Sequence, residues 1–524
     1  MEDKGGQRQF GRLRSMFWPI YNFELKKFLP MSLLMICMLF TYTLLRDLKD
    51  TLIQSFATGG GTEMISSLKT WIVIPCSFLF MAAFVKLANK VSAAKVFYSV
   101  IIFFVSYFLL FGFVLFPNVE YLHGSAEFIE AARTKVPWLH WIIPCFTNWT
   151  YSLAYVLAEL WGAAVISLLF WQFANEITKT TEAPRFYSLF GFFGNLGLLA
   201  SGELVESFSR KAKKTVEAGG NEMLAFGSNL KLQMLCILSC AIVALFTYAW
   251  MQRNVLTDPK LYSPGMGKKK SKPKMGVAES FVYVLTNPYI LLIALLVLCY
   301  GMSLHLNEII WKAQVKLRFP EGNAYNEFMG GVSKRTGLLT MIIMIVGANV
   351  LKSGKWRTSA LVTPIFTGVT VAVFFALMLY KEKIGEGGMI WGISLLNACV
   401  TLGMYQIACS KGVKYSLFDS TKNMAYLPLE SDEKLKAQAA VEVIGGRLGK
   451  GSGATIVMIL TNAKWFGEKV VDPGNMRIVM GMMFTIVGVW IFAVLKINPR
   501  VTKKLEERAR EEKEEKATVA KANA

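Results

Sequence analysis

Charged side chains lie inside or at the ends of long apolar segments of this sequence, and both signs of charge occur there: Lys49, Glu159, Glu308 and Lys450. Glu159 is the clearest case, because it is the one charge in the apolar stretch 149–171. A charge at the centre of a bilayer costs roughly 2.5–3.5 kcal/mol on insertion scales, so such a group normally faces a polar cavity. The pattern therefore predicts a path for a charged solute through a membrane.

Two pairs of cations have the same spacing. Arg46 and Lys49 share one face of a helix, and Arg447 and Lys450 repeat the arrangement in a glycine-rich apolar segment. Arginine binds phosphate through a planar fork, and lysine binds it as a point charge. Both pairs are therefore candidates to hold the phosphate groups of a substrate. The first pair, which is flanked by aspartates, is equally compatible with a salt-bridge cluster where the segment meets water.

The two carboxylates need partners. Glu308 has Lys312 one helical turn further on, which allows a local ion pair worth roughly 0.2–0.5 kcal/mol. Glu159 has no charged neighbour on its own helix, so its partner is a cation elsewhere or a proton. We expect Glu159 and Glu308 to pair with the cations of the site when no substrate is bound. If Glu159 takes up a proton instead, it is the proton site of a symporter.

Polar and aromatic side chains in the apolar segments are further candidates for contact with a nucleobase. Four amides can hydrogen-bond a base edge or hold helices together: Asn175, Asn195, Asn307 and Asn397. Three aromatic side chains can stack on a base: Tyr155, Trp161 and Tyr405. Aromatic residues on membrane helices more often pack or anchor the helix at the interface, so packing is the main alternative for these three.

The segment GGRLGKGSG (445–453) superficially resembles a phosphate-binding loop. The pattern requires glycine where this chain has Ile444, and Ser or Thr where it has Gly451. No strand is predicted before it, so an ATPase of this type is excluded. The eight cysteines and three histidines form no metal-ligand spacing, and the cysteines are interpreted as small buried hydrophobes. We expect no cofactor, no metal site and no enzymatic activity.

The chain of 524 residues is 54% hydrophobic and 18% charged, and apolar windows long enough to cross a bilayer recur along it. We predict an all-α membrane protein with twelve transmembrane helices in two six-helix halves, similar to the major facilitator architecture. The expected spans are 28–45, 71–87, 97–116, 149–171, 186–205, 232–250, 289–311, 338–351, 359–380, 389–409, 439–460 and 479–494.

Most of the net charge of +21 follows the positive-inside rule. The expected parts are a cytoplasmic arm (1–27), a first bundle (28–251), a basic cytoplasmic linker (252–286), a second bundle (287–497) and a charged cytoplasmic tail (498–524). The linker run GKKKSKPK is interpreted as flexible and not as a nucleic-acid-binding arm. Because the arm contains Glu2 and Asp3, it differs from an organelle transit peptide, and we expect a bacterial inner membrane protein.

Five long motifs resemble those of the ATP/ADP translocase family of obligate intracellular bacteria and plastids. They are LRDLKDTL (45–52), YVLAELWGAAVISLLFWQFAN (155–175), GMSLHLNEIIWK (301–312), KYSLFDSTKNMAYLPL (414–429) and GRLGKGSGA (446–454). The four charged positions that this family uses for transport fall on Lys49, Glu159, Glu308 and Lys450. The substrate site is therefore expected to contain these four residues, with Arg46, Arg447, Asn195 and Tyr155 beside them.

The resemblance implies an antiporter that imports ATP from a host in exchange for ADP, with or without phosphate, by alternating access. Members of the family differ, and a proton-coupled importer of nucleoside triphosphates or NAD is the alternative. A nucleotide-binding sensor or enzyme is a third reading, which the failed phosphate-loop pattern disfavours. The expected partners are ATP, ADP, phosphate in one version of the exchange, and the lipid bilayer, and the protein is expected to be a monomer.

Overall fold

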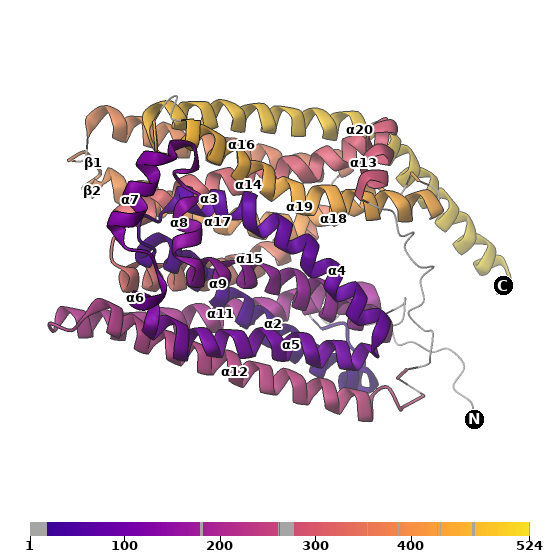
Figure 1. Ribbon diagram of the computed structural model, residues 1–524. Helices are drawn as coiled ribbons and strands as arrows, with labels where there is room; N and C mark the ends of the chain where they lie inside the picture. Colours follow the sequence, from indigo (N-terminus) through magenta and orange to yellow (C-terminus); the bar gives the residue numbers. More distant parts are fainter. Residues whose placement is uncertain are drawn as a thin grey trace.

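The computed structural model describes residues 18–178, 182–259, 261–262, 277–353, 355–385, 387–426, 428–429, 431–463 and 467–522. Most of these residues are helical, and the long helices lie side by side in one bundle (Figure 1). Inside a bilayer no water can satisfy backbone N–H and C=O groups, so a helix, which satisfies them internally, is the structure expected of each apolar segment.

The first half of the chain contributes six long membrane-crossing runs. The α-helices are α2 (Leu25–Thr51), α3 (Thr62–Leu68), α4 (Ile74–Lys90), α5 (Ala93–Leu110), α6 (Val119–Leu122), α7 (Ala126–Lys135), α8 (Ile143–Thr147), α9 (Trp149–Trp161), α10 (Trp171–Ile177), α11 (Ala183–Glu217) and α12 (Glu222–Asn254). Wider π-helical turns continue several of them: η2 (Leu52–Phe56), η3 (Lys69–Val73), η4 (Phe111–Leu115) and η7 (Gly162–Phe170). Short 3-10 turns are η1 (Asn22–Glu24), η5 (Phe116–Asn118) and η6 (Pro137–Leu139).

The second half begins with a short helix in the region expected to be linker. Its elements are α13 (Val277–Thr286), α14 (Pro288–Arg318), α15 (Gly322–Ser353), α16 (Trp356–Ile384), β1 (Met389–Ile390), β2 (Ile393–Ser394), α17 (Leu395–Val413), the π-helical turn η8 (Lys414–Phe418), α18 (Asp419–Ala425), α19 (Ser431–Ala463) and α20 (Pro473–Ala522). Residues 263–276, which include the basic run expected to be flexible, lie outside the described residues.

Ten helical runs in the described part of the chain are long and apolar enough to cross a membrane. Nine of them contain a predicted span, and the run Gly322–Gly347 overlaps the predicted span 338–351 only in part. The predicted spans 389–409 and 439–460 fall on α17 and α19, which are outside this set. The expected start at residue 389 is wrong, because β1 and β2 pair there as an antiparallel hairpin. Its turn uses Trp391 and Gly392, with φ of 48° and 77°, and α17 begins only after it, with the Ser394 hydroxyl capping the helix. The predicted all-α membrane class is otherwise confirmed.

Hydrogen bonds connect the two halves at one end of the bundle. There Lys316 Nζ donates to Ser55 Oγ at 3.2 Å, and the backbone N–H of Val470 donates to Glu63 Oε1 at 2.9 Å. Helix α2 begins and α20 finishes at the opposite end (Figure 1). The contacts between the halves therefore close the end that is remote from the chain termini.

Helices α11 and α15 pack across the interface between the halves through glycine. A Cβ atom on Gly202 would lie 2.4 Å from the backbone nitrogen of Lys334, and one on Gly330 would lie 2.7 Å from the backbone nitrogen of Glu206. Small residues of this kind allow membrane helices to approach until their backbones touch. The close approach holds the halves together beside the centre of the bundle.

Substituting Gly330 by alanine is expected to destabilise this interface by about 1–3 kcal/mol, because the new methyl group meets backbone that can move only if the helices separate. The measurement is the thermal unfolding midpoint of the purified protein in detergent. Gly481→Ala on α20 is the matched control, since nothing lies within 4 Å of the added Cβ and alanine favours the helix. Equal midpoints for the two variants would contradict the expectation.

Candidate functional site

A cavity of about 490 Å³ lies between the two halves near the middle of the bundle. Its charged and titratable lining residues are Arg46, Lys49, Asp50, Lys69, Glu159, His305, Glu308 and Lys312. They come from α2, η3 and α9 in the first half and from α14 in the second half. The other lining residues come mainly from α4 and η7, with Tyr42 of α2, Tyr415 of η8 and Gly451 of α19 among them.

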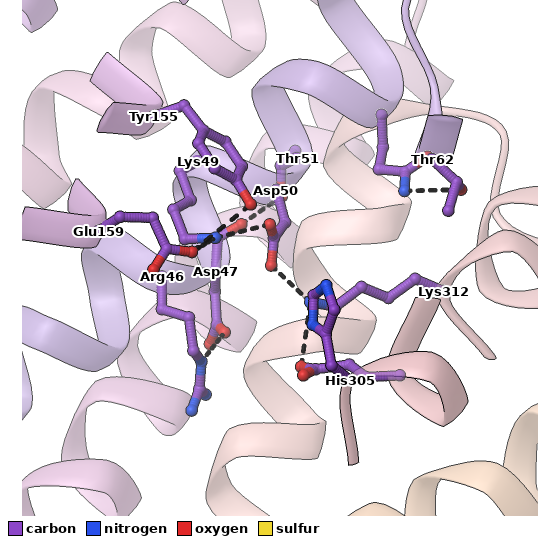
Figure 2. Close-up of polar contacts among 12 residues, drawn as sticks. Arg46, Asp47, Lys49, Asp50, Thr51, Thr62, Tyr155, Glu159, His305 and Lys312 are labelled. Carbon is purple, nitrogen blue, oxygen red and sulfur yellow. Dashed lines mark hydrogen bonds and ion pairs between the residues drawn. The ribbon is translucent and has the colours of Figure 1, made fainter. Parts of the chain in front are cut away.

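Five of these side chains form one continuous chain of ion pairs, which runs in the order Glu159, Lys49, Asp50, Lys312, Glu308. Lys49 Nζ lies 3.0 Å from Glu159 Oε1 and 2.9 Å from Asp50 Oδ1. Lys312 Nζ lies 2.7 Å from Asp50 Oδ2 and 3.0 Å from Glu308 Oε1. Figure 2 shows Lys49 between Glu159 and Asp50, and Asp50 reaching toward Lys312. The bond between Asp50 and Lys312 crosses from one half to the other.

Burial makes this chain of charges energetically sensitive. Asp50 is 1% exposed, and the side chains of Lys49 and Lys312 are 5% and 8% exposed. A buried charge is tolerated when it is paired and hydrogen-bonded, and removing one partner typically costs about 3–5 kcal/mol. An anion that enters the cavity and takes a lysine therefore leaves a buried carboxylate without that partner, and its contact with the lysine has to offset this cost.

Both carboxylates identified from the sequence have a cation partner here. Glu159 contacts Lys49 of a different helix, and Glu308 contacts Lys312 of its own helix. The local Glu308–Lys312 pair was predicted as an alternative at the membrane edge, whereas the structure places both residues on the wall of the central cavity. The same lysine also holds Asp50, so the local pair is one link of the chain between the halves.

Arg46 lies next to the ion-pair chain and also connects the two halves. Its Nε lies 3.0 Å from Asp47 Oδ1, and its Nη2 donates to the Ser333 hydroxyl of α15 at 2.7 Å. That hydroxyl donates in turn to the second oxygen of Asp47. The guanidinium lines the cavity while two partners fix its orientation.

Tyr155 is placed behind Lys49 and does not line the cavity. The lysine Nζ lies 4.0 Å from the centre of the tyrosine ring, and the tyrosine hydroxyl donates to Glu159 Oε1 at 3.5 Å. The ring is fully buried. Tyr155 therefore holds both Lys49 and Glu159 in position, and its ring face is covered by the ammonium group.

The other polar and aromatic candidates mostly contact neighbouring helices. Asn195 Nδ2 donates to the carbonyl of Gly191 at 2.8 Å and faces Met344 of α15, outside the cavity lining. Three others hydrogen-bond to protein groups: Asn175 accepts from Tyr187, Asn397 accepts from Arg318, and Trp161 donates to the carbonyl of Met38. Asn307 is buried, and Tyr405 is about half exposed. None of these side chains is part of the cavity lining.

The side chains of Arg447 and Lys450 lie outside the described residues, although helix α19 itself is described. The next residue, Gly451, lines the cavity, so this part of the helix runs along its wall. A Cβ atom on Gly451 would lie 2.9 Å from Ile74 Cδ1, which places this turn of α19 against α4 of the other half.

Lys69 and His305 also line the cavity, and the sequence did not indicate a role for Lys69. Lys69 directly precedes an apolar segment, where a lysine ordinarily marks the edge of the membrane. In the structure it belongs to a π-helical turn, and its side chain is 16% exposed.

Known proteins resemble this chain along nearly its whole length. The family described as TLC ATP/ADP transporter matches residues 3–500. The chain is 41% identical over 503 residues to ADP,ATP carrier protein 1 of Chlamydia pneumoniae, covering 94% of this chain and 95% of the relative. It is 41% identical over 505 residues to ADP,ATP carrier protein 1 of Rickettsia prowazekii, covering 95% and 98%.

Solved structures resemble this chain in fold alone. A bacterial homologue of the iron transporter ferroportin, in its inward-facing state, has a TM-score of 0.51 at 14% identity and covers 93% of this chain and 99% of its own. A bacterial homologue of the lysosomal transporter Spinster, also inward-facing, has a TM-score of 0.50 at 12% identity and covers 93% and 98%. These likenesses confirm the predicted major-facilitator-like arrangement.

Proposed function

Because this chain belongs to the TLC ATP/ADP transporter family, we propose that it exchanges ATP for ADP across a bacterial inner membrane by alternating access. The observation that carries the proposal is the chain of buried ion pairs that joins the two halves at the central cavity. An anionic substrate that competes for these lysines also loosens the link between the halves. Binding and the change of access are coupled in this way.

The basic arm, linker and tail support an orientation in which both termini are in the cytoplasm. The end closed by contacts between the halves then faces outward, and the cavity faces the cytoplasm. In this state the carrier releases ATP and receives ADP. The outward-facing state requires the Asp50–Lys312 pair and the contacts around it to open.

We assign the phosphate groups to Lys49 and Arg46 on α2 and to Arg447 and Lys450 on α19. Glu159 and Glu308 neutralise the lysines when the site is empty and return to them when nucleotide leaves. The ring of Tyr155 contacts the ammonium group of Lys49 and holds it in position. Asn195 supports the contact between α11 and α15 beside the site.

The test of the function is counter-exchange in liposomes. Purified protein should take up labelled ATP when ADP or ATP is loaded inside, and should take up little into empty liposomes. No phosphate should be released from ATP, because the chain lacks a phosphate loop for hydrolysis. Uptake at full rate into empty liposomes would contradict exchange, and accumulation driven by a pH gradient alone would identify the proton-coupled alternative.

Substituting Glu159 by glutamine is expected to slow exchange about tenfold or more and to leave ATP binding within about threefold of wild type. Glutamine cannot neutralise Lys49, so the empty carrier is destabilised and bound phosphate is displaced less easily. The measurements are exchange in liposomes and ATP binding in detergent. Glu130→Gln serves as the control, because its side chain is exposed and pairs with Arg133 of its own helix at 3.4 Å. Complete loss of ATP binding in a folded Glu159 variant would show that this carboxylate contacts the substrate directly.

A further inference from the structure

We propose that Lys69 and His305 together form a second phosphate-binding position in the cavity, which is completed by one residue from each half. The occupant is a phosphate group, either the terminal phosphate of the nucleotide or free inorganic phosphate. The proposal rests on the proposed nucleotide exchange and adds two residues that the sequence pattern did not assign to the site.

Lys69 is the cavity lysine whose charge is least neutralised. Lys49 and Lys312 each have two carboxylates within 3.0 Å. The nearest carboxylate oxygen to Lys69 among the described residues is Glu159 Oε1 at 4.0 Å, and that oxygen already lies 3.0 Å from Lys49. The net electrostatic energy of binding an anion is most favourable at a cation without a close carboxylate, because no existing ion pair has to break.

His305 supplies the second half of the position. Its Nδ1 lies 3.5 Å from Lys69 Nζ, and because an ammonium group can only donate, Nδ1 is the acceptor and the hydrogen of the neutral ring is on Nε2. The residue is 4% exposed, and Nε2 has no hydrogen-bond partner among the described residues. A buried N–H group normally has a partner, so an unsatisfied one on the cavity wall indicates an acceptor that arrives with the substrate.

The backbone next to the two side chains is irregular at Lys69 and closely packed at His305. Lys69 is the first residue of η3, a π-helical turn, and π-turns inside α-helices are frequent at functional sites. On the other side, a Cβ atom on Gly453 would lie 3.2 Å from His305 Cδ2, next to the unsatisfied nitrogen. Helix α19 therefore packs closely against that edge of the ring, and Nε2 is covered in this state.

The ammonium group and the imidazole N–H are both donors, so they favour an acceptor-rich anion over the sugar or base of a nucleotide. Lys69 belongs to the first half and His305 to the second. A phosphate held by both therefore bridges the halves in the cavity that the Asp50–Lys312 pair also lines. It replaces part of the contact between the halves that is lost when that pair opens.

The experiment measures binding of ATP, ADP and inorganic phosphate to the purified full-length protein in detergent. Lys69→Gln should weaken ATP and ADP binding at least about tenfold, the effect of losing one charge-assisted hydrogen bond. Lys69→Arg should retain most of the affinity. Lys86→Gln is the matched control, because Lys86 is an exposed lysine on the neighbouring helix α4.

A second pair of variants tests the histidine and remains informative if Lys69→Gln does not fold. His305→Leu removes the donor and should weaken binding, whereas His305→Gln keeps an N–H group near the position of Nε2 and should restore it in part. If phosphate competes with ATP in wild type and not in the Lys69 variant, the occupant includes free phosphate. If phosphate does not compete in wild type but both nucleotides lose affinity in the variant, the occupant is the terminal phosphate of the nucleotide.

The proposal is overturned if the Lys69→Gln and His305→Leu variants bind all three ligands as Lys86→Gln does. Its failure is distinguishable from failure of the proposed function, because the two have different readouts. Wild-type protein that does not exchange ATP for ADP in liposomes contradicts the function, while a selective loss of binding in the Lys69 variant still supports the phosphate position.

Discussion

Lys49→Gln is expected to reduce ATP/ADP exchange at least about 100-fold, because it leaves two carboxylates without their shared cation in a buried site. Asp50 retains Lys312, whereas the ion pair between Glu159 and Lys69 is longer, at 4.0 Å. The variant also loses a cation that we assign to the substrate phosphates. The measurement is the initial rate of labelled ATP uptake into ADP-loaded liposomes, normalised to the amount of folded protein.

Lys26→Gln is the control for this variant because it removes a lysine from the same helix. Lys26 pairs with Asp258 at 3.4 Å, and its side chain is 48% exposed. Exposed pairs contribute about 0–1 kcal/mol, so exchange should stay within a few-fold of wild type. Equal exchange rates for Lys49→Gln and Lys26→Gln would contradict the assignment of the ion-pair chain to transport.

A double variant separates the two roles of Lys49. In Lys49→Gln combined with Glu159→Gln, the carboxylate of Glu159 is removed together with the ammonium group of Lys49. The stability that Lys49→Gln alone loses should therefore be largely recovered. Exchange should remain low, because the phosphate groups still lack the lysine. Recovery of exchange together with stability would show that Lys49 serves only to neutralise Glu159.

The residues of the site that could be predicted from the sequence are those whose charge is costly in its context. Glu159 is recognisable because it interrupts an apolar stretch long enough to span a bilayer. Lys69 is not recognisable, because a lysine next to an apolar segment is ordinarily explained by the membrane surface. Its location on the cavity wall depends on a π-helical turn, and no residue type in that turn indicates it.

The ion pair between Asp50 and Lys312, which joins the two halves, could not be predicted from the sequence either. Lys312 was visible as a local partner of Glu308, but its bond to Asp50 depends on how α14 packs against α2. The apolar segments predict that such helices exist and do not determine their mutual rotation. The order of the links in the ion-pair chain is therefore a property of the packing.

The fold was predictable where hydrophobicity alone determines it. The apolar segments gave most of the membrane-crossing helices, because length and composition suffice for that inference. The error at residue 389 arose because Met389, Ile390, Trp391 and Ile393 are apolar yet form a hairpin. Gly388 and Gly392 are the local indication of a turn in that segment, and a hydrophobicity window gives them little weight.

The second large effect concerns the membrane potential. ATP carries one more negative charge than ADP near neutral pH, so exchange of the two alone moves one charge per cycle. Against an inside-negative potential this costs about 2.3 kcal/mol per 100 mV. At equilibrium this energy changes the ATP/ADP ratio inside, relative to the ratio outside, by roughly 50-fold. If one phosphate of single negative charge leaves with each ADP, the cycle is neutral and the potential has no effect.

We expect phosphate to leave with ADP, because a bacterium that imports ATP otherwise works against its own membrane potential. The measurement is ATP accumulation in liposomes under an imposed potential of about 100 mV, with ADP inside and with or without phosphate. With phosphate inside, accumulation should change less than about twofold when the potential is applied. A roughly 50-fold response that phosphate does not alter would show instead that the exchange is electrogenic, and that the gradients of ATP and ADP alone drive import.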